Sequence, residues 1–350
     1  MSLHMIKKSL FIVTMVASSQ AWCWGSRGHH LVCRSAVYLL KNESLKNFML
    51  GRGDMMGHLC DVPDIYWKSL GNDVRKVENP SHFINGDLLD VSYDQVSENY
   101  QDVIKQYTGF QSALKEKPIQ SVPEELGSLW WRAGQFFDRA FSFASVAQQR
   151  PIPASKNDER NDQFPYNKAV FDMMTNMGLM GHYVGDASMP LHSSYDYDGY
   201  ADGHGGIHFF YEDSVVNELS PEIIGEIIKK AKSHGKEKFM NSSSVIAAMK
   251  ELTVTAQSEK ALMYKLDVMT KPSEIKQEKG MQLRTPAERP EARLVAQKFK
   301  PLIVLQLSRS AALLAKSWDD FYQKANTPDL TKYKSFAYPI TPAYVAPDYQ

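Results

Sequence analysis

The chain has 350 residues, of which 40 are basic and 40 are acidic, so its formal net charge is zero. This balance excludes the broad basic surface that draws nucleic acid or an anionic membrane from a distance. A polyanion would have to be bound by local charge or by metal ions. The length suits one large domain or two small ones.

Residues 1–23 are predicted to be a signal peptide. Lys7 and Lys8 form the positive region, residues 9–17 form a short apolar core, and Ala21 and Cys23 are the small residues of a cleavage site. The apolar run is too short to span a bilayer, and no other stretch approaches ~18 apolar residues. We therefore expect a secreted or periplasmic protein that is not integral to the membrane and that is cleaved near Cys23-Trp24.

Apolar residues recur at helical spacing along most of the remaining chain, and alternating strands are scarce. We expect a first helix that begins at Gly28-His29. Residues 170–184 are rich in methionine and should form a deeply buried helix. The further helices are expected over 126–146, 170–184, 221–233, 242–267 and 290–324. Pro301 should kink or break the last of them. The sequence thus predicts an all-α fold.

The expected loops, residues 151–165 and 271–286, are rich in Pro, Asn, Asp or charged residues and do not divide the chain into domains. We expect one multi-helix domain over residues 24–326. Residues 327–350, with four prolines, should form an extended tail packed on the surface. Export would permit a Cys33–Cys60 disulfide, but two small buried hydrophobic residues are an equal alternative.

Five potential metal ligands lie within the 31 residues from His182 to Glu212. His182 and Asp186, like His208 and Glu212, are four residues apart, which puts each pair on one face of a helix. Imidazole and carboxylate are ligands that zinc accepts. A single pair would be ordinary helix surface or core, but two pairs joined by His192 indicate a metal cluster.

The predicted mature N-terminus adds further candidates. Trp24 would offer a free α-amine and a carbonyl five residues before His29. An α-amine has a pKa near 8, so it loses its proton to a metal at little cost.

Between these segments, Asp64 and His82 supply another carboxylate and imidazole. Asp61 competes with Asp64 for the ligand role. Pro63 also fits a helix start, where Asp64 would only cap the helix.

In their order, these motifs from Trp24 to Glu212 resemble the superfamily of zinc-dependent phospholipases C and single-strand-specific nucleases, including nuclease/3′-nucleotidases. The resemblance implies an all-α bundle that binds three zinc ions. It assigns Asp64, His82, His182 and Asp186 to one zinc, His192, His208 and Glu212 to a second, and Trp24 and His29 to a third that shares Asp186. The expected reaction is hydrolysis of a phosphate ester by a metal-activated water, which Asp64 would help to orient.

The sequence does not decide between the two branches of this superfamily. The short spacing from Trp24 to His29 is the nuclease pattern, and Arg27 would repel a choline headgroup. The 16-residue step from His192 to His208 and the presence of Glu212 favour a phospholipase.

Two further features bear on a nucleic-acid substrate. Lys68 stands near the position where nucleases carry a phosphate-binding arginine. Phe83 or Phe209 would stack on bases near the cleft, and core packing is an equal alternative for Phe83.

The leading hypothesis is a secreted zinc-dependent single-strand-specific nuclease or 3′-nucleotidase, and the alternative is a zinc-dependent phospholipase C. A non-enzymatic helical protein with structural zinc is a third possibility, although such a site needs only about four ligands. The substrate would be single-stranded nucleic acid or phospholipid, and no stable protein partner is implied. The ligand types also suit other divalent metals.

Overall fold

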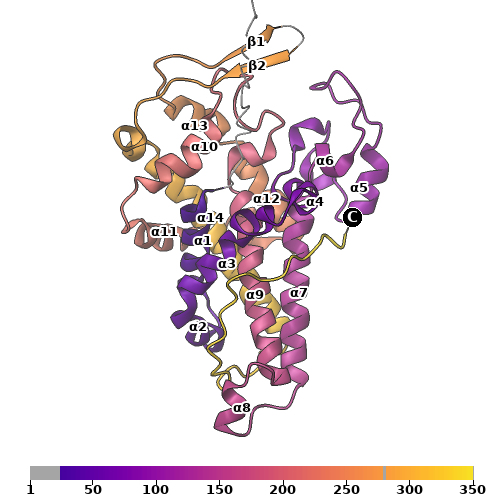
Figure 1. The fold of residues 1–350 in the computed structure, drawn as a ribbon, viewed down its shortest axis with the longest axis vertical. Coiled ribbons are helices and arrows are strands. Elements are labelled where there is room, and N and C mark those ends of the chain that lie inside the picture. Colours follow the sequence, from indigo (N-terminus) through magenta and orange to yellow (C-terminus); the bar gives the residue numbers. More distant parts are fainter. Residues whose placement is uncertain (1–23, 279–280, 350) are drawn as a thin grey trace, which may run out of the picture.

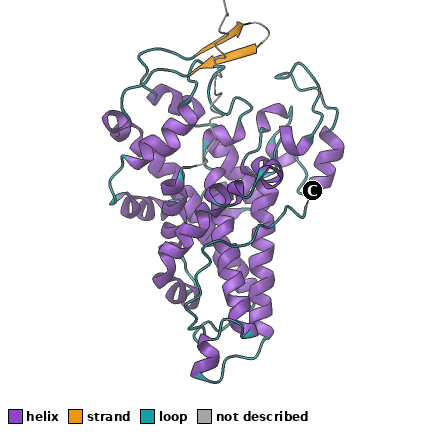
Figure 2. Ribbon diagram, viewed as in Figure 1, coloured by secondary structure: helices purple, strands orange, loops and turns teal. Residues whose placement is uncertain are grey.

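The computed structural model describes residues 24–278 and 281–349, so the predicted signal peptide lies outside the described residues. The described chain is mostly helical, with one two-stranded sheet at an end of the molecule (Figure 2). The all-α class expected from the sequence is confirmed. Among the described helices, none is both long and apolar enough to cross a membrane.

Three long helices form the centre of the molecule. Helices α7 (Leu129–Gln149) and α9 (Pro165–Asp186) lie side by side, and α14 (Ala292–Lys324) packs against both (Figure 1). The Met-rich run of α9, from Met173 to Met180, is buried at this centre, as the sequence predicts. The apolar faces of these helices therefore form one continuous core.

Shorter elements surround the three long helices. The other α-helices are α1 (Ser26–Leu39), α2 (Glu43–Met49), α3 (Gly53–Ile65), α4 (Asn72–Glu78), α5 (Tyr100–Tyr107), α6 (Val122–Glu125), α8 (Lys156–Arg160), α10 (Ile207–Phe209), α11 (Ile223–Ala231), α12 (Val245–Gln257) and α13 (Lys260–Leu266). The 3₁₀ turns are η1 (Leu50–Arg52), η2 (Trp67–Ser69), η3 (Asn79–His82), η4 (Gly86–Leu88), η5 (Tyr93–Gln95), η6 (Pro190–Ser193) and η8 (Lys238–Asn241), and η7 (Phe210–Val215) is a π-helical turn.

Most expected helices are present within a few residues of their predicted bounds, but residues 242–267 form two helices, not one. The chain turns between α12 and α13, where Glu259 faces α14. Its carboxylate accepts hydrogen bonds from Gln306 (3.0 Å) and Arg309 (2.5 Å). The chain thus turns where Glu259 bonds to a helix that is distant in the sequence. The periodicity of residues 242–267 gives no sign of such contacts.

Of the two outcomes expected at Pro301, a kink or a break, the break does not occur, because α14 continues through the proline. Pro301 lies on the exposed face, so water can bind the Gln297 carbonyl that loses its usual N–H partner. The proline therefore costs one hydrogen bond at a solvated position and leaves the buried face intact.

Both expected loops contain secondary structure. Residues 151–165 include the one-turn helix α8, and Ser155 caps it by accepting a hydrogen bond from the Asp158 amide (3.1 Å). Residues 271–286 form an antiparallel hairpin of β1 (Glu274–Glu278) and β2 (Met281–Thr285). Almost every residue of the hairpin is exposed, which explains why its sequence lacks the alternation typical of a half-buried strand.

A disulfide between Cys33 and Cys60 joins α1 to α3. Helix α9 crosses this bridge at Gly181, where an added Cβ would lie 2.1 Å from the Cys33 sulfur and 2.9 Å from the Cys60 sulfur. Only glycine allows α9 to approach this closely. The approach brings His182, the next residue, against the two disulfide-linked helices.

The tail after α14 is extended and runs back across the molecule to end beside α5 (Figure 1). The Trp67 indole donates to the Pro342 carbonyl (3.0 Å), and Arg132 donates to the Val345 carbonyl (2.7 Å). Tyr349 places its hydroxyl 3.0 Å from the Ser128 hydroxyl. The tail is thus bound to the side of the domain that carries η3.

Candidate metal centre

The candidate ligands come from separate elements that meet at the C-terminal end of α9. Trp24 precedes α1, which carries His29, and Asp64 lies in the last turn of α3. The remaining positions are His82 at the end of η3, His182 and Asp186 in the last turns of α9, His192 in η6, His208 in α10 and Glu212 in η7. Pro63 does not begin a helix as the capping alternative requires, because α3 continues through it to Ile65.

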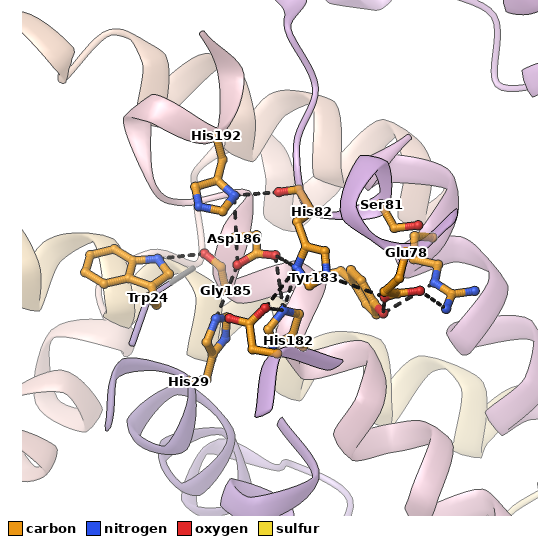
Figure 3. Close-up of polar contacts among 12 residues, drawn as sticks. Trp24, His29, Glu78, Ser81, His82, His182, Tyr183, Gly185, Asp186 and His192 are labelled. Atoms are coloured by element: carbon orange, nitrogen blue, oxygen red, sulfur yellow. Dashed lines mark hydrogen bonds and ion pairs between the residues drawn. The ribbon is translucent and has the colours of Figure 1, made fainter. Parts of the chain in front are cut away.

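Asp186 lies at the middle of this group (Figure 3). Its Oδ2 is 3.2 Å from His82 Nδ1 and 3.4 Å from His182 Nε2, and its Oδ1 is 3.3 Å from His29 Nε2. The same Oδ1 is 4.0 Å from His192 Nδ1. One fully buried carboxylate therefore faces four imidazoles.

Asp64 joins this group from the other side. Its Oδ1 is 3.6 Å from His82 Nδ1 and 3.7 Å from His182 Nε2, and those two nitrogens are 2.8 Å apart. His182 Nδ1 donates to the Cys60 carbonyl (2.7 Å), so its Nε2 carries the lone pair that faces the group. Asp64 also pairs with Lys68, whose Nζ is 2.6 Å from Oδ1.

His192 and His208 present two lone pairs to each other. His192 Nδ1 donates to the His82 carbonyl (2.5 Å), and His208 Nδ1 donates to the Tyr197 carbonyl (2.6 Å). A carbonyl can only accept, so both Nε2 atoms are unprotonated in the neutral rings. These two atoms are 3.1 Å apart, and Glu212 Oε1 is 3.1 Å from His208 Nε2. Three electron-rich atoms therefore face one point.

Burial makes this arrangement costly without a cation. Burial raises the pKa of Glu212 well above its ordinary value and lowers the pKa of His208. Neither carboxylate oxygen of Glu212 has a hydrogen-bond donor among the described residues. Buried polar atoms without partners are unfavourable, and a bound divalent cation would satisfy all three groups at once.

Asp186 is held ionised by its neighbours. Burial alone would raise its pKa, but His182 and His192 outweigh burial and hold the pKa well below the ordinary value. Burial also lowers the pKa of His182, to which His29 adds. An ionised carboxylate is the form of Asp186 that can bind a metal.

Three groups of described side chains could each hold a metal ion. They are His29 with Asp64 and His182, His82 with His182 and Asp186, and His192 with His208 and Glu212. The third group matches the ligand set expected for the second zinc. The other two groups have His182 in common, and His29 lies in one of them together with Asp64. The side-chain geometry therefore does not divide these residues between a first and a third zinc ion, as the resemblance does.

Trp24 is buried against the same end of α9. Its indole Nε1 donates to the Gly185 carbonyl (2.9 Å) (Figure 3). The Trp24 ring lies 5.7 Å from that of Tyr211. Its own carbonyl accepts from the His29 amide (3.3 Å). Residue 24 is thus fixed next to His29, and the use of its amine as a ligand stays a prediction.

A cavity of about 300 Å³ opens beside the centre. Three of the candidate ligand histidines line it, and its other lining residues are Lys68, Arg75, Asn79, Phe83, Asn85, Leu191 and Tyr197. The suggestion that Phe83 lines a pocket is confirmed. Phe209 is 50% exposed and lies outside the lining, so its proposed stacking role finds no support.

One other expectation concerned a residue near this cavity. Arg27 donates to the carbonyls of Val216 (3.0 Å) and Asn217 (2.7 Å) and does not line the cavity, so its charge cannot select against a choline headgroup there.

Sequence reasoning missed the residues that support His82. Glu78 Oε1 lies 3.5 Å from His82 Nε2, and Arg132 Nη2 donates to Glu78 Oε2 (2.7 Å). Tyr183 also donates to Glu78 (2.5 Å) (Figure 3). The one available signal was Arg132 itself, a charged residue inside the most apolar stretch of its helix.

No family model matches the chain. A curated protein from Bradyrhizobium tropiciagri, named a probable serine protease, is 24% identical over 242 residues. The match covers 54% of this chain and 28% of that protein, so the chain spans less than a third of the relative's length. This likeness does not show a family, and the relative's name is at most a weak indication of a hydrolase.

Proposed function

We propose that this protein is a metal-dependent phosphodiesterase, that its metals are zinc, and that it belongs to the zinc phospholipase C and single-strand nuclease superfamily. The observation that carries the proposal is the pair of Nε2 lone pairs of His192 and His208, 3.1 Å apart and facing Glu212. Core histidines satisfied by the protein would not be arranged in this way. Nitrogen and oxygen donors of this kind suit zinc.

The protein side chains have defined tasks in such a reaction. Bound zinc would supply a hydroxide near neutral pH and a Lewis acid for the phosphate. Asp64 would accept a hydrogen bond from the attacking water and so orient it. Burial would raise the pKa of Asp64, but Lys68 and His182 outweigh it, so the carboxylate stays an acceptor. No protein nucleophile is needed.

We further propose that the substrate is single-stranded nucleic acid, in preference to phosphatidylcholine. Lys68 and Arg75 line the cavity, and no aspartate or glutamate among the described residues does. This lining suits an anionic chain, whereas a choline cation would lie beside the two positive charges of Lys68 and Arg75 with no carboxylate to offset them. Phe83 offers a ring on which a base can stack. Phospholipase C activity remains the alternative, since Phe83 and Leu191 also make an apolar wall.

A serine-protease function, suggested by the relative's name, has one feature in its favour. Ser308 Oγ lies 2.8 Å from His234 Nε2, and His234 Nδ1 lies 2.5 Å from Glu237 Oε1. However, Ser308 is fully buried within α14, and its hydroxyl also lies 2.8 Å from the Leu305 carbonyl. A peptide could not reach this serine without unfolding the helix, so the arrangement is structural.

Export is part of the proposal. The Cys33–Cys60 disulfide suits an oxidising compartment such as the periplasm or the extracellular space. The mature chain would then begin at Trp24.

The test is a direct comparison of substrates with protein that begins at Trp24. Single-stranded DNA, RNA and mixed phospholipid vesicles would each be incubated with the protein, with and without a chelator, followed by reloading with zinc or manganese. We expect nucleic-acid cleavage that the chelator abolishes and zinc restores. His192→Ala should abolish it, whereas His58→Ala, a histidine outside the centre, should not.

Each other outcome has a defined meaning. Lipid cleavage without nucleic-acid cleavage would replace the nuclease by a phospholipase C. Activity that survives chelation would reject the metal mechanism. Zinc binding with no hydrolysis of any phosphodiester would indicate a structural site.

A further inference from the structure

Arg75 is a cation that faces the cavity from helix α4. It lines the cavity together with Asn79, one helical turn further on. Its Nε and Nη2 donate to the Lys68 carbonyl at 3.2 and 3.1 Å. The backbone therefore fixes one edge of the guanidinium, and its other N–H groups are not needed to hold it in place.

Arg75 also lacks a counterion. Among residues 24–278 and 281–349, no carboxylate oxygen lies within 4.0 Å of its guanidinium, and no acidic residue lines the cavity. The next residue, Lys76, is paired with Glu124 (3.6 Å) and is highly exposed. A half-buried, anchored arginine without a carboxylate, in a cavity that has apolar walls, is typical of a site for an anion.

The two cations of the cavity lie at different distances from the ligands. Lys68 contacts the ligand Asp64 directly, whereas Arg75 contacts the backbone of Lys68 and none of the candidate ligands. Lys68 therefore belongs to the place where the reacting phosphate would bind. Arg75 lies on the same wall of the cavity, further from the candidate ligands than Lys68 does.

We propose that Arg75 binds the phosphate next to the scissile one and so makes the site selective for polynucleotides over single phosphodiesters. This inference rests on the proposed nuclease function. A polynucleotide offers a second phosphate along the chain, and a guanidinium binds its oxygens with paired N–H donors. A substrate with a single phosphate leaves Arg75 unused. Arg75 thus determines substrate length and takes no part in the hydrolysis step.

The test compares substrates that have one phosphate with substrates that have several. Arg75→Ala should raise KM for an oligonucleotide about tenfold, the usual loss for a hydrogen bond to a charged group, with kcat unchanged. A dinucleotide and bis(p-nitrophenyl) phosphate should be hydrolysed as by the wild type. The slope of log(kcat/KM) against log[salt] for the oligonucleotide should fall by about 0.7, the value for one phosphate contact on a single strand.

Two controls separate this role from a structural one. Lys76→Ala removes the same charge from the neighbouring position of α4 and should change no parameter by more than about twofold. Arg75→Lys keeps the charge but cannot keep the paired donors, so it should rescue binding only in part. A phosphorothioate oligonucleotide, which resists hydrolysis, should bind the zinc-loaded Arg75→Ala protein about tenfold more weakly by fluorescence anisotropy.

The outcomes distinguish this inference from the proposed function. Equal losses on all substrates, or none on the oligonucleotide, would overturn the role of Arg75 while the nuclease function stands. If the wild-type protein cleaves no oligonucleotide, both the nuclease function and this inference fall.

Discussion

Arg132 is the residue whose replacement should destabilise the fold most clearly. It is fully buried, and its guanidinium donates to Glu78 (2.7 Å), Gln135 (2.6 Å), the Val345 carbonyl (2.7 Å) and the Tyr183 hydroxyl (3.3 Å). It therefore binds together α4, α7, α9 and the C-terminal tail. Methionine would fill much of the same volume without any of these hydrogen bonds.

The expected cost of Arg132→Met is about 3–5 kcal/mol, the range found when one partner of a buried ion pair is removed. Most of this cost comes from Glu78, which stays fully buried and loses its counterion. Arg139→Met is the matched control on the same helix. Arg139 makes one side-chain hydrogen bond, to Asn176 (2.9 Å), at a partly exposed position, so its loss should cost about 1 kcal/mol.

The loss of unfolding free energy caused by Arg132→Met should depend on pH in a defined direction. Burial would raise the pKa of Glu78, but Arg132 outweighs it and lowers the pKa below the ordinary value. In the wild type, this carboxylate therefore stabilises the fold above its unfolded pKa, and the stabilisation is lost as the pH falls. Without Arg132 the largest influence that opposes burial is lost, so the pKa of Glu78 rises, and the penalty decreases as the carboxylate is protonated.

Urea unfolding of both variants measures this prediction. Chelated protein should be used, so that the loss of metal from histidines at low pH does not contribute. The difference in the free energy of unfolding between wild type and Arg132→Met should be largest near pH 7 and should shrink toward about pH 4.5. A cost equal to that of Arg139→Met, or one that does not change with pH, would refute the assignment of a charged Glu78 held by Arg132.

Three further predictions concern the metal centre and its support. Chelation should lower the thermal midpoint of the wild type, and zinc should restore it while magnesium should not, because zinc prefers nitrogen ligands; an unchanged midpoint would contradict metal binding. Glu212→Gln should lower the zinc content by one ion but leave chelated protein about as stable as the wild type, since burial raises the pKa of Glu212 well above its ordinary value and the side chain is then neutral in both proteins; unchanged zinc content by atomic absorption would exclude Glu212 as a ligand. Gly181→Ala should cost about 1–3 kcal/mol in urea unfolding, because its Cβ would overlap the sulfurs of Cys33 and Cys60; an unchanged midpoint would show that α9 can move away.

The sequence predicted the parts of this molecule that depend on short-range spacing. The i,i+4 pairs His182–Asp186 and His208–Glu212 place their side chains together because a helical turn does so regardless of the rest of the fold. The long helices followed from apolar faces in the same way. The assignment of nine particular ligands to three zinc ions stays a prediction, since it depends on how distant segments meet.

The features that the sequence did not predict depend on contacts between distant segments. Nothing near Glu78 in the chain indicates that Arg132, 54 residues later, would neutralise it. Likewise, the anion-binding character of Arg75 depends on the Lys68 carbonyl, and the hairpin after residue 273 lacks alternation because it has no core to face. Periodicity reports burial along one element, and it carries no information about which polar groups meet across the core.

The orientation of the histidines argues that the fold prepares the centre before metal binds. Backbone carbonyls of His82 and Tyr197 each accept the Nδ1 proton of His192 or His208, which fixes both rings with Nε2 directed inward. These carbonyls belong to η3 and to the loop before α10, and the fold positions both without reference to a cation. The inward direction of both lone pairs, toward Glu212, is therefore imposed by the backbone. A bound cation would accept these lone pairs, so its affinity should depend on the elements that hold the two carbonyls as much as on the candidate ligands themselves.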